Sequence, residues 1–87
     1  MKNVYPIVLI SEKVGYTVYI PDFDINTQGN DLSEAIEMAR DAIGIMGIDL
    51  EEDGKAIPAP SSVTDITLRA NEHLSFVDVD FTEYRRK

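Results

Sequence analysis

The first part of the chain alternates between apolar runs and short polar breaks in a way that predicts a β-hairpin. The continuous apolar run Tyr5–Ile10 is rich in β-branched residues, which is typical of a strand buried on both faces. Turn-forming residues follow over Ser11–Gly15, and then Tyr16–Ile20 alternates in the manner of a second strand. Pro21 removes a backbone donor and ends this strand, and Ile25–Gln28 predicts a short third strand.

The spacing of apolar residues then lengthens to three and four, which predicts a helix of about four turns. Asp31 is a suitable N-cap, and Glu34 three residues later completes an approximate capping box. Gly44 and Gly47 weaken the end of this helix, and one further short helical turn is expected within Ile48–Lys55. The apolar stripe of the main helix comprises Leu32, Ile36, Ala39, Ile43 and Met46.

The remainder of the chain predicts extended structure. Ala56–Ser62 contains two prolines and is expected to be an extended connection. Val63–Leu68 and Ser75–Phe81 have the composition of strands, and His73 falls in the loop between them. The resulting order of strand, strand, short strand, helix and strand predicts an α+β domain. We expect one long helix packed on a mostly antiparallel sheet of roughly three to five strands.

Length and charge restrict the classes of function. The chain has 87 residues, enough for one domain with a single core. Its sixteen acidic and eight basic residues give a formal net charge of −8. Such a surface repels phosphate backbones, so we predict no direct nucleic-acid binding by this chain. The same charge either attracts a basic protein partner or serves only to keep the protein in solution.

The sequence has no cysteine, which excludes disulfides and thiolate metal sites and fits a cytoplasmic location. No apolar run approaches the roughly 20 residues that a membrane helix needs, so we predict no membrane association.

An alternation of acids after the second predicted strand suggests a calcium loop at first sight. Asp22, Asp24 and Asn26 match the first three ligand positions of an EF-hand. The motif also needs Gly at its sixth position and a bidentate Glu at its twelfth, and this chain has Thr27 and Ser33 there. We therefore predict no calcium site, and we expect these acids to support a tight turn.

Other candidate chemistry is equally incomplete. Asp78 and Asp80 share one face of a predicted strand, but same-face residues lie roughly 6.5 to 7 Å apart and do not converge on one ion by themselves. They are typical of a charged, solvent-facing edge strand. His73 is the only histidine and has no nucleophile motif beside it. We predict no catalytic residue, no metal and no cofactor, and we expect a binding module.

An ordered set of short motifs resembles the HicB family of antitoxins. The set begins with Gly15-Tyr16 and Pro21-Asp22, and it continues with a Thr-x-Gly segment at 27–29 and Glu34-Ala35 at the helix start. Ile57–Ser62 resembles the Pro-x-Pro-Ser segment of the family, and Phe76–Lys87 resembles its last strand. The resemblance covers nearly the whole chain.

This resemblance implies a partial ribonuclease-H-like fold without nuclease activity. It implies the antitoxin domain of a type II toxin–antitoxin system, which binds and neutralises a small basic HicA-type toxin that cleaves mRNA. Homo-oligomers are common in the family. Its members usually carry a C-terminal DNA-binding domain, which residues 1–87 do not include, so we expect one antitoxin domain without direct DNA binding.

The acids flanking the helix start are the leading candidates for contact with such a toxin. We expect Asp22, Phe23 and Asp24 to form the main contact, with Asp78 and Asp80 next. For Phe23, packing against the helix as a core residue is an alternative. Two other functions remain open from the sequence: an orphan oligomeric regulatory domain with a different ligand, and a metal-dependent nuclease.

Overall fold

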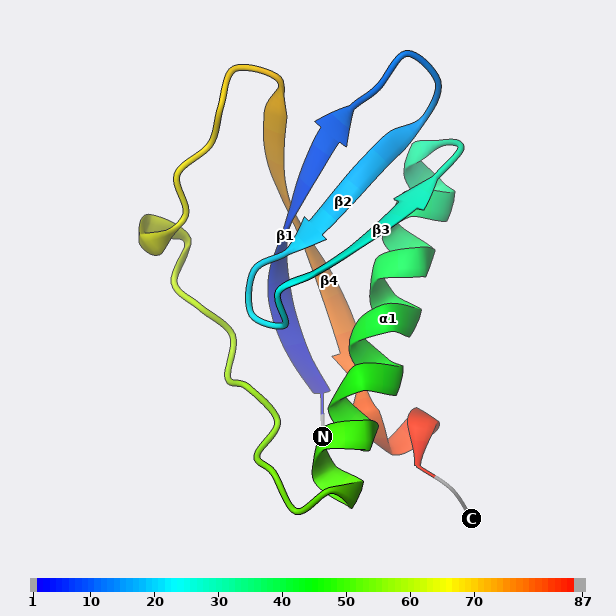
Figure 1. Cartoon of the computed structure of the whole chain (residues 1–87), viewed down its shortest axis with the longest axis vertical. Coiled ribbons are helices and arrows are strands. Elements are labelled where there is room, and N and C mark those ends of the chain that lie inside the picture. The colour runs from blue at the N-terminus through cyan, green and yellow to red at the C-terminus, as the bar shows by residue number, and fades with distance from the viewer. Residues whose placement is uncertain (1, 86–87) are drawn as a thin grey trace.

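The protein is an antiparallel sheet with one long helix against one face (Figure 1). This computed structural model describes residues 2–85. The four strands lie in the order β3-β2-β1-β4, and all three pairings are antiparallel, which confirms the predicted α+β class. The elements are β1 Lys2–Ser11, β2 Tyr16–Ile20, β3 Ile25–Gly29, α1 Leu32–Glu52, β4 Glu72–Asp80, and the 3-10 turns η1 Val63–Asp65 and η2 Phe81–Tyr84.

The first strand is the centre of the core. Residues 5–9 of β1 are all buried, as the continuous apolar run predicts for a strand covered on both faces. On one side β1 pairs with β2, where Leu9 lies opposite Val18. On the other side it pairs with β4, where Tyr5 lies opposite Val77. The predicted strands Tyr16–Ile20 and Ile25–Gln28 are confirmed, the latter extending to Gly29.

The helix is longer than the sequence predicts. It runs without interruption through Gly44 and Gly47 to Glu52, so the expected break and the separate short turn within Ile48–Lys55 were wrong. Both glycines are buried, and each faces an aromatic ring of η2: the ring of Tyr84 lies over Gly44 and that of Phe81 over Gly47. The packing of these rings offsets the low helix propensity of glycine.

Both ends of α1 have well-defined caps. Asp31 is the N-cap, as predicted, and its carboxylate accepts a 2.8 Å hydrogen bond from the backbone N–H of Glu34. The Glu34 carboxylate reaches back one residue further than in the usual capping box and accepts from the N–H of Asn30 at 2.9 Å. At the other end Gly54 adopts a φ of 76°, and Lys55 N–H bonds back to the Leu50 carbonyl at 2.8 Å, forming a Schellman motif.

The buried stripe of the helix differs in part from the predicted one. Ala39 and Ile43 are fully buried as expected, whereas Leu32 is 46% exposed. Ala35 is fully buried instead, because the start of the helix approaches β3 closely. A Cβ on Gly29 of β3 would meet the backbone of Ala35, so only glycine fits at this crossing.

Two predictions for the C-terminal half were wrong. Val63–Leu68 is not a strand: it contains only the 3-10 turn η1 and then an unpaired extended stretch. Part of this stretch, Asp65–Thr67, lines a groove together with Val8 of β1 and Tyr19 of β2, so it lies against a face of the sheet and pairs with no edge strand. Its β-branched residues remain largely exposed. His73 is exposed as expected, but it lies in β4 opposite Leu9 and not in a loop.

The last strand is β4, Glu72–Asp80, where the sequence predicted Ser75–Phe81. Val77 and Val79 are buried on the helix face, and Phe76 is 49% exposed on the other, as the alternation predicts. Phe81 begins η2 and not the end of the strand, but its ring is fully buried and lies 6.1 Å from that of Tyr5 in an edge arrangement.

Candidate partner interface

The turn between β2 and β3 carries the first group of predicted contact residues. Pro21 begins the turn, and its carbonyl accepts from the N–H of Asp24 at 3.3 Å. Asp24 adopts a φ of 50°, a left-handed conformation that Asp tolerates better than most residues. The expected tight turn is therefore confirmed, but the carboxylates of Asp22 and Asp24 bond to Ser61 and Tyr19 and not to the backbone of the turn.

Phe23 of this turn packs against the core. Its ring lies 5.3 Å from that of Tyr5, at an interplanar angle of 67°, and the side chain is half-buried. The alternative interpretation of Phe23, a core residue packed against the helix, is confirmed as to the core, but the ring that Phe23 contacts belongs to Tyr5 of β1. The remaining exposed part of Phe23 stays available to a partner.

Asp22 ties the turn to the proline-bearing connection. Its carboxylate accepts a hydrogen bond from the N–H of Ser61 at 3.1 Å and another from the Ser61 hydroxyl. Nearby, the Tyr5 hydroxyl donates to the carbonyl of Pro58 at 2.7 Å. These bonds hold the connection against the sheet although it has no regular secondary structure. Asp22 is consequently half-buried and has a structural role of its own.

Asp24 is the exposed acid of the turn. Its carboxylate accepts a 2.9 Å hydrogen bond from the hydroxyl of Tyr19. This hydrogen bond, with a smaller effect of burial, raises the pKa of Tyr19 above its usual value of 10.0. One carboxylate oxygen of Asp24 remains open to a donor from outside.

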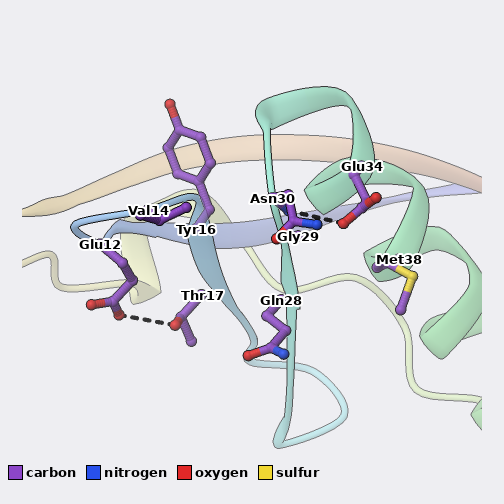
Figure 2. Close-up of a pocket in the computed structure, with 9 residues that line it drawn as sticks. All are labelled: Glu12, Val14, Tyr16, Thr17, Gln28, Gly29, Asn30, Glu34 and Met38. Atoms are coloured by element: carbon purple, nitrogen blue, oxygen red, sulfur yellow. Dashed lines mark hydrogen bonds between the residues drawn. The ribbon is translucent and has the colours of Figure 1, made fainter.

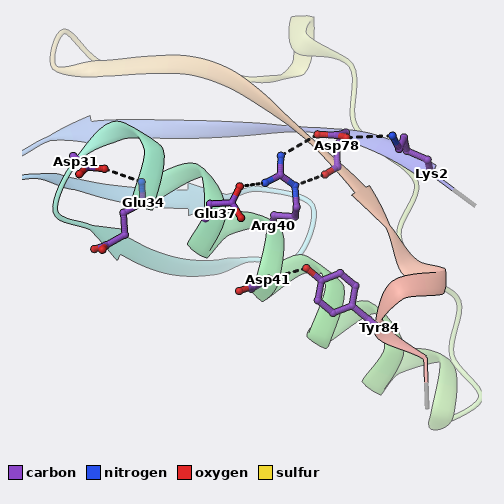
Figure 3. A network of polar contacts seen from close by, with 8 residues as sticks. All are labelled: Lys2, Asp31, Glu34, Glu37, Arg40, Asp41, Asp78 and Tyr84. Atoms are coloured by element: carbon purple, nitrogen blue, oxygen red, sulfur yellow. Dashed lines mark hydrogen bonds and ion pairs between the residues drawn. The ribbon is translucent and has the colours of Figure 1, made fainter. Parts of the chain in front are cut away.

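Asp78 lies on β4, where Arg40 of α1 covers the free edge of the strand (Figure 3). Arg40 Nε donates to the Asp78 carbonyl at 2.9 Å, and Arg40 Nη2 lies 3.0 Å from the Asp78 carboxylate. Lys2 Nζ lies 3.4 Å from the same carboxylate, and Glu37 pairs with Arg40. The hydrogen bond from Arg40 is the main cause that holds the pKa of Asp78 below its usual range.

Asp80 has a local structural role. It is the N-cap of η2, and its carboxylate accepts from the N–H of Thr82 at 3.0 Å. This backbone hydrogen bond lowers the pKa of Asp80. The two acids of the Val-Asp-Val-Asp segment therefore have different partners and do not converge.

The five predicted contact residues form two groups on different elements of the sheet. Asp22, Phe23 and Asp24 cluster in the β2–β3 turn, and the other two lie on β4, with β1 between the groups in the sheet. Within residues 2–85, no group of three or more acidic or histidine side chains is arranged to hold a metal ion. No helix in that part of the chain is both long and apolar enough to cross a bilayer.

One acidic feature was missed by the sequence reasoning. A groove of about 450 Å³ separates the β1–β2 hairpin from the start of α1, and Glu12 and Glu34 line it (Figure 2). They lie at opposite ends of this groove, with β2 and β3 between them (Figure 2). Little in the sequence indicates this groove, because Glu12 lies next to a turn and Glu34 next to a helix cap, where acidic residues are common.

The fold and these contacts define a small α+β domain with acidic side chains on its turns and on its edge strand. A family model described as a HicB-like antitoxin of bacterial toxin–antitoxin system matches residues 5–87. The chain belongs to this family of antitoxins, which confirms the resemblance seen in its motifs and the expectation of a non-enzymatic protein.

Solved structures agree with this assignment. A chain of a toxin–antitoxin complex from Streptococcus pneumoniae is similar with a TM-score of 0.86 and 29% identity, over 97% of this chain and 73% of that one. A chain of a HicA3 and HicB3 toxin–antitoxin complex shares the fold with a TM-score of 0.72 and 24% identity, over 88% of this chain and 98% of that one. A comparison with curated proteins gives no significant match.

Proposed function

We propose that this chain binds and neutralises a HicA-type toxin that cleaves mRNA. The observation that supports this most directly is the match of residues 5–87 to a family of antitoxins. The similarity over 97% of the chain to a component of a toxin–antitoxin complex adds to it. Residues 1–87 act in this proposal as one antitoxin domain, in the cytoplasm where the mRNA is.

Electrostatics favours such a partner. A protein that binds RNA needs a basic surface, and this chain has a formal net charge of −8. Opposite charges steer the two proteins together and raise the association rate, most strongly at low salt. Exposed carboxylates placed on the RNA-binding surface of the toxin occupy the positions of phosphates, which prevents the toxin from binding mRNA.

Within this proposal the β2–β3 turn is the main contact. Asp24 supplies an exposed carboxylate, and the exposed part of Phe23 supplies an apolar anchor. Asp22 presents its charge from a position fixed by Ser61. Asp78 and Asp80 form a secondary contact, weakened at Asp78 by the neutralising neighbours Arg40 and Lys2.

We also propose that the protein forms a homo-oligomer. The supporting observation is that β4 is an edge strand, to which an identical strand can add across a two-fold axis. Arg40 occupies the edge carbonyl of Asp78, so such pairing is restricted to the rest of the strand. The molar mass in solution from light scattering tests this: a single monomeric species over a wide concentration range contradicts it.

The function is tested by titrating the purified chain into a HicA-type toxin while RNA cleavage by the toxin is followed. We expect cleavage to stop near a fixed molar ratio of the two proteins. The double variant Asp22→Asn/Asp24→Asn tests the contact, because Asn retains an acceptor for Ser61 and tolerates the left-handed backbone of Asp24. The matched control is Asp65→Asn/Glu83→Gln, which removes equal charge from exposed positions in η1 and η2.

The expected result is a dissociation constant about tenfold higher for the turn variant than for the control. Equal affinities for the two variants at low salt contradict the assignment of the turn. Cleavage that continues at any excess of the wild-type chain, across several HicA-type toxins, contradicts the function itself.

A further inference from the structure

The outer edge of β3 is an open row of backbone hydrogen-bonding groups. β3 is the last strand on one side of the sheet and pairs only with β2 (Figure 1). Residues of an antiparallel pair alternate between those that bond to the neighbouring strand and those that face away from it. A Cβ on Gly15, next to β2, would meet the carbonyl oxygen of Gly29, so Gly29 and every second residue before it face β2. The backbone groups of Asn26 and Gln28 therefore face away from the sheet.

This edge lacks the features that usually prevent another strand from adding. β3 contains no proline and no charged side chain. Asn26 and Gln28 are exposed, and within residues 2–85 neither forms a hydrogen bond outside the β2–β3 ladder. The opposite edge of the sheet is better protected, because Arg40 covers the Asp78 carbonyl of β4 and acidic side chains occur along that strand. Of the two edges, β3 is the one more open to an added strand.

The charges at the two ends of β3 determine which kind of strand fits. Asp24 directly precedes β3 and Asp31 follows it closely, and both are exposed and form no ion pair within residues 2–85. If two copies of β3 paired antiparallel about Thr27, Asp24 of one copy would face Asn30 of the other, next to Asp31. Like charges would then adjoin at both ends, in a chain of net charge −8. An extended segment with basic residues at its ends has the complementary charge.

The surface beside this edge has both apolar and acidic parts. Met38 is 44% exposed and Glu34 is exposed, and both line the same groove as Gln28 and Gly29 of β3. Figure 2 shows the two helix residues on the side of β3 that lies away from β2. The side chains of an added strand alternate between the two faces of the sheet, so those on the helix side meet this surface.

We propose that an extended basic segment of the protein partner adds to β3 as a further antiparallel or parallel strand of the sheet. The backbone groups of Asn26 and Gln28 form the new ladder, and the acids at the ends of β3 attract the basic side chains of the segment. The edge continues directly from the β2–β3 turn, so the two contacts form one surface. The inference rests on the proposed function only in taking the partner to be a HicA-type toxin.

Amide hydrogen exchange distinguishes an added strand from simple coverage of the surface. In the complex with a HicA-type toxin, exchange at Asn26 and Gln28 should slow by about tenfold more than at Thr27, which already bonds to β2. Equal slowing at all three residues, or none, overturns the proposal, whereas the proposed function stands if the toxin is neutralised. Slow exchange at Asn26 and Gln28 in the free chain at high concentration also overturns it, because a second copy then occupies the edge.

A proline on the edge tests the same backbone groups. Gln28→Pro removes an N–H that faces outward and leaves the bonds to β2 in place, which an edge strand tolerates. Gln28→Ala is the matched control, because it removes the same side chain but keeps the N–H. We expect the dissociation constant for a HicA-type toxin to rise about tenfold in Gln28→Pro and less than about twofold in Gln28→Ala. Equal affinities of the two folded variants overturn the proposal.

A peptide probe tests the edge without any toxin. The acetylated and amidated peptide Arg-Thr-Val-Thr-Arg is titrated into isotopically labelled chain, and amide shifts are followed by NMR. The control peptide has the same sequence and charge but carries N-methyl groups on its three central residues, which removes their donors. We expect shifts at Asn26 and Gln28 with the first peptide and not with the control. Equal shifts with both peptides, or none with either, overturn the added strand. This holds even where no HicA-type toxin binds, a result that contradicts only the proposed function.

Discussion

The hydroxyl of Tyr5 donates a 2.7 Å hydrogen bond to the carbonyl oxygen of Pro58 in the connection after the helix. The Tyr5 side chain has no exposed surface, and its ring also contacts those of Phe23 and Phe81. One residue of the first strand therefore joins the β2–β3 turn, the proline-bearing connection and the C-terminal turn. The Tyr5 hydroxyl thereby holds the proline-bearing connection, which belongs to no helix or strand.

Replacing Tyr5 with Phe should loosen that segment. The variant keeps the ring packing but leaves the Pro58 carbonyl without this donor, which costs about 1 kcal/mol of unfolding free energy. Urea denaturation measures the loss, and faster amide exchange at Ser61, whose N–H bonds to Asp22, locates it. Tyr19→Phe is the matched control, because its hydroxyl bonds to Asp24 on the surface. A loss at Tyr19 as large as that at Tyr5 contradicts the special role of Tyr5.

Gly47→Ala should destabilise the protein, which is opposite to the effect that helix propensity predicts. In an exposed helix the change from Gly to Ala gains about 1 kcal/mol. At position 47 a Cβ would lie less than 3.0 Å from ring atoms of Phe81, a fully buried side chain without room to move. We expect a net loss of about 1–3 kcal/mol, as for other overpacked cores.

Two comparisons sharpen this prediction. Gly44→Ala meets the ring of Tyr84, which is half-buried and has more freedom to shift, so its loss should be smaller. Ser33→Ala at an exposed position of the first turn should be close to neutral. Thermal unfolding of the three variants gives the order. A Gly47→Ala protein that melts above wild type shows that the ring of Phe81 does not constrain the helix.

Gly44 and Gly47 mark the part of the fold that local sequence patterns did not predict. The strands of residues 2–29, the N-cap at Asp31 and the antiparallel α+β class follow from local patterns of apolar and capping residues. The length of the helix does not, because it depends on rings that lie more than thirty residues later in the chain. The strand predicted over Val63–Leu68 was wrong for a similar reason: its composition favours a strand, but the fold places Asp65–Thr67 against a face of the sheet and not beside an edge strand.

The candidate interface was likewise predicted only in its local features. The sequence placed Asp22 and Asp24 correctly in a turn after Pro21, because Pro and Asp favour turns locally. It gave no indication that Ser61 holds Asp22 or that Arg40 neutralises Asp78, since these partners are separated by 39 and 38 positions. Long-range partners of this kind determine how much charge each acid presents to another protein.

The Arg40–Asp78 contact should make stability depend on acid pH. The hydrogen bond from Arg40 lowers the pKa of Asp78 below 3.8 in the folded chain, so the folded state binds this proton less tightly than the unfolded state. The contribution of Asp78 is therefore complete above about pH 3.8 and is lost as the pH falls through the folded pKa. In Asp78→Asn the melting temperature should fall less steeply below that pH than in wild type.

The measurement is a series of thermal melts between about pH 2 and 6 at low salt, where ion pairs are least screened. Glu83→Gln is the control, since Glu83 is exposed and forms no ion pair within residues 2–85. Parallel curves for wild type and Asp78→Asn across this range are inconsistent with an ion pair that contributes to folding. Parallel curves for wild type and Glu83→Gln are the expected outcome.

At the opposite end of the pH scale, Tyr84 should ionise well above the usual tyrosine pKa of 10.0. Burial and the 2.7 Å hydrogen bond from its hydroxyl to Asp41 raise the pKa of Tyr84 to about 12 (Figure 3). Because the folded state holds this proton more tightly than the unfolded state, its contribution to stability is complete below about pH 10.0 and is lost as the pH rises toward 12.

Ultraviolet titration of tyrosinate, with Tyr84→Phe as the reference for the difference spectrum, measures the pKa of Tyr84. Asp41→Asn keeps an acceptor but removes the charge, so it should lower the pKa of Tyr84 without abolishing the shift due to burial. If Tyr84 ionises near 10 in the folded wild type, its ring does not pack over Gly44 as described, and the small effect expected for Gly44→Ala would then have a different cause.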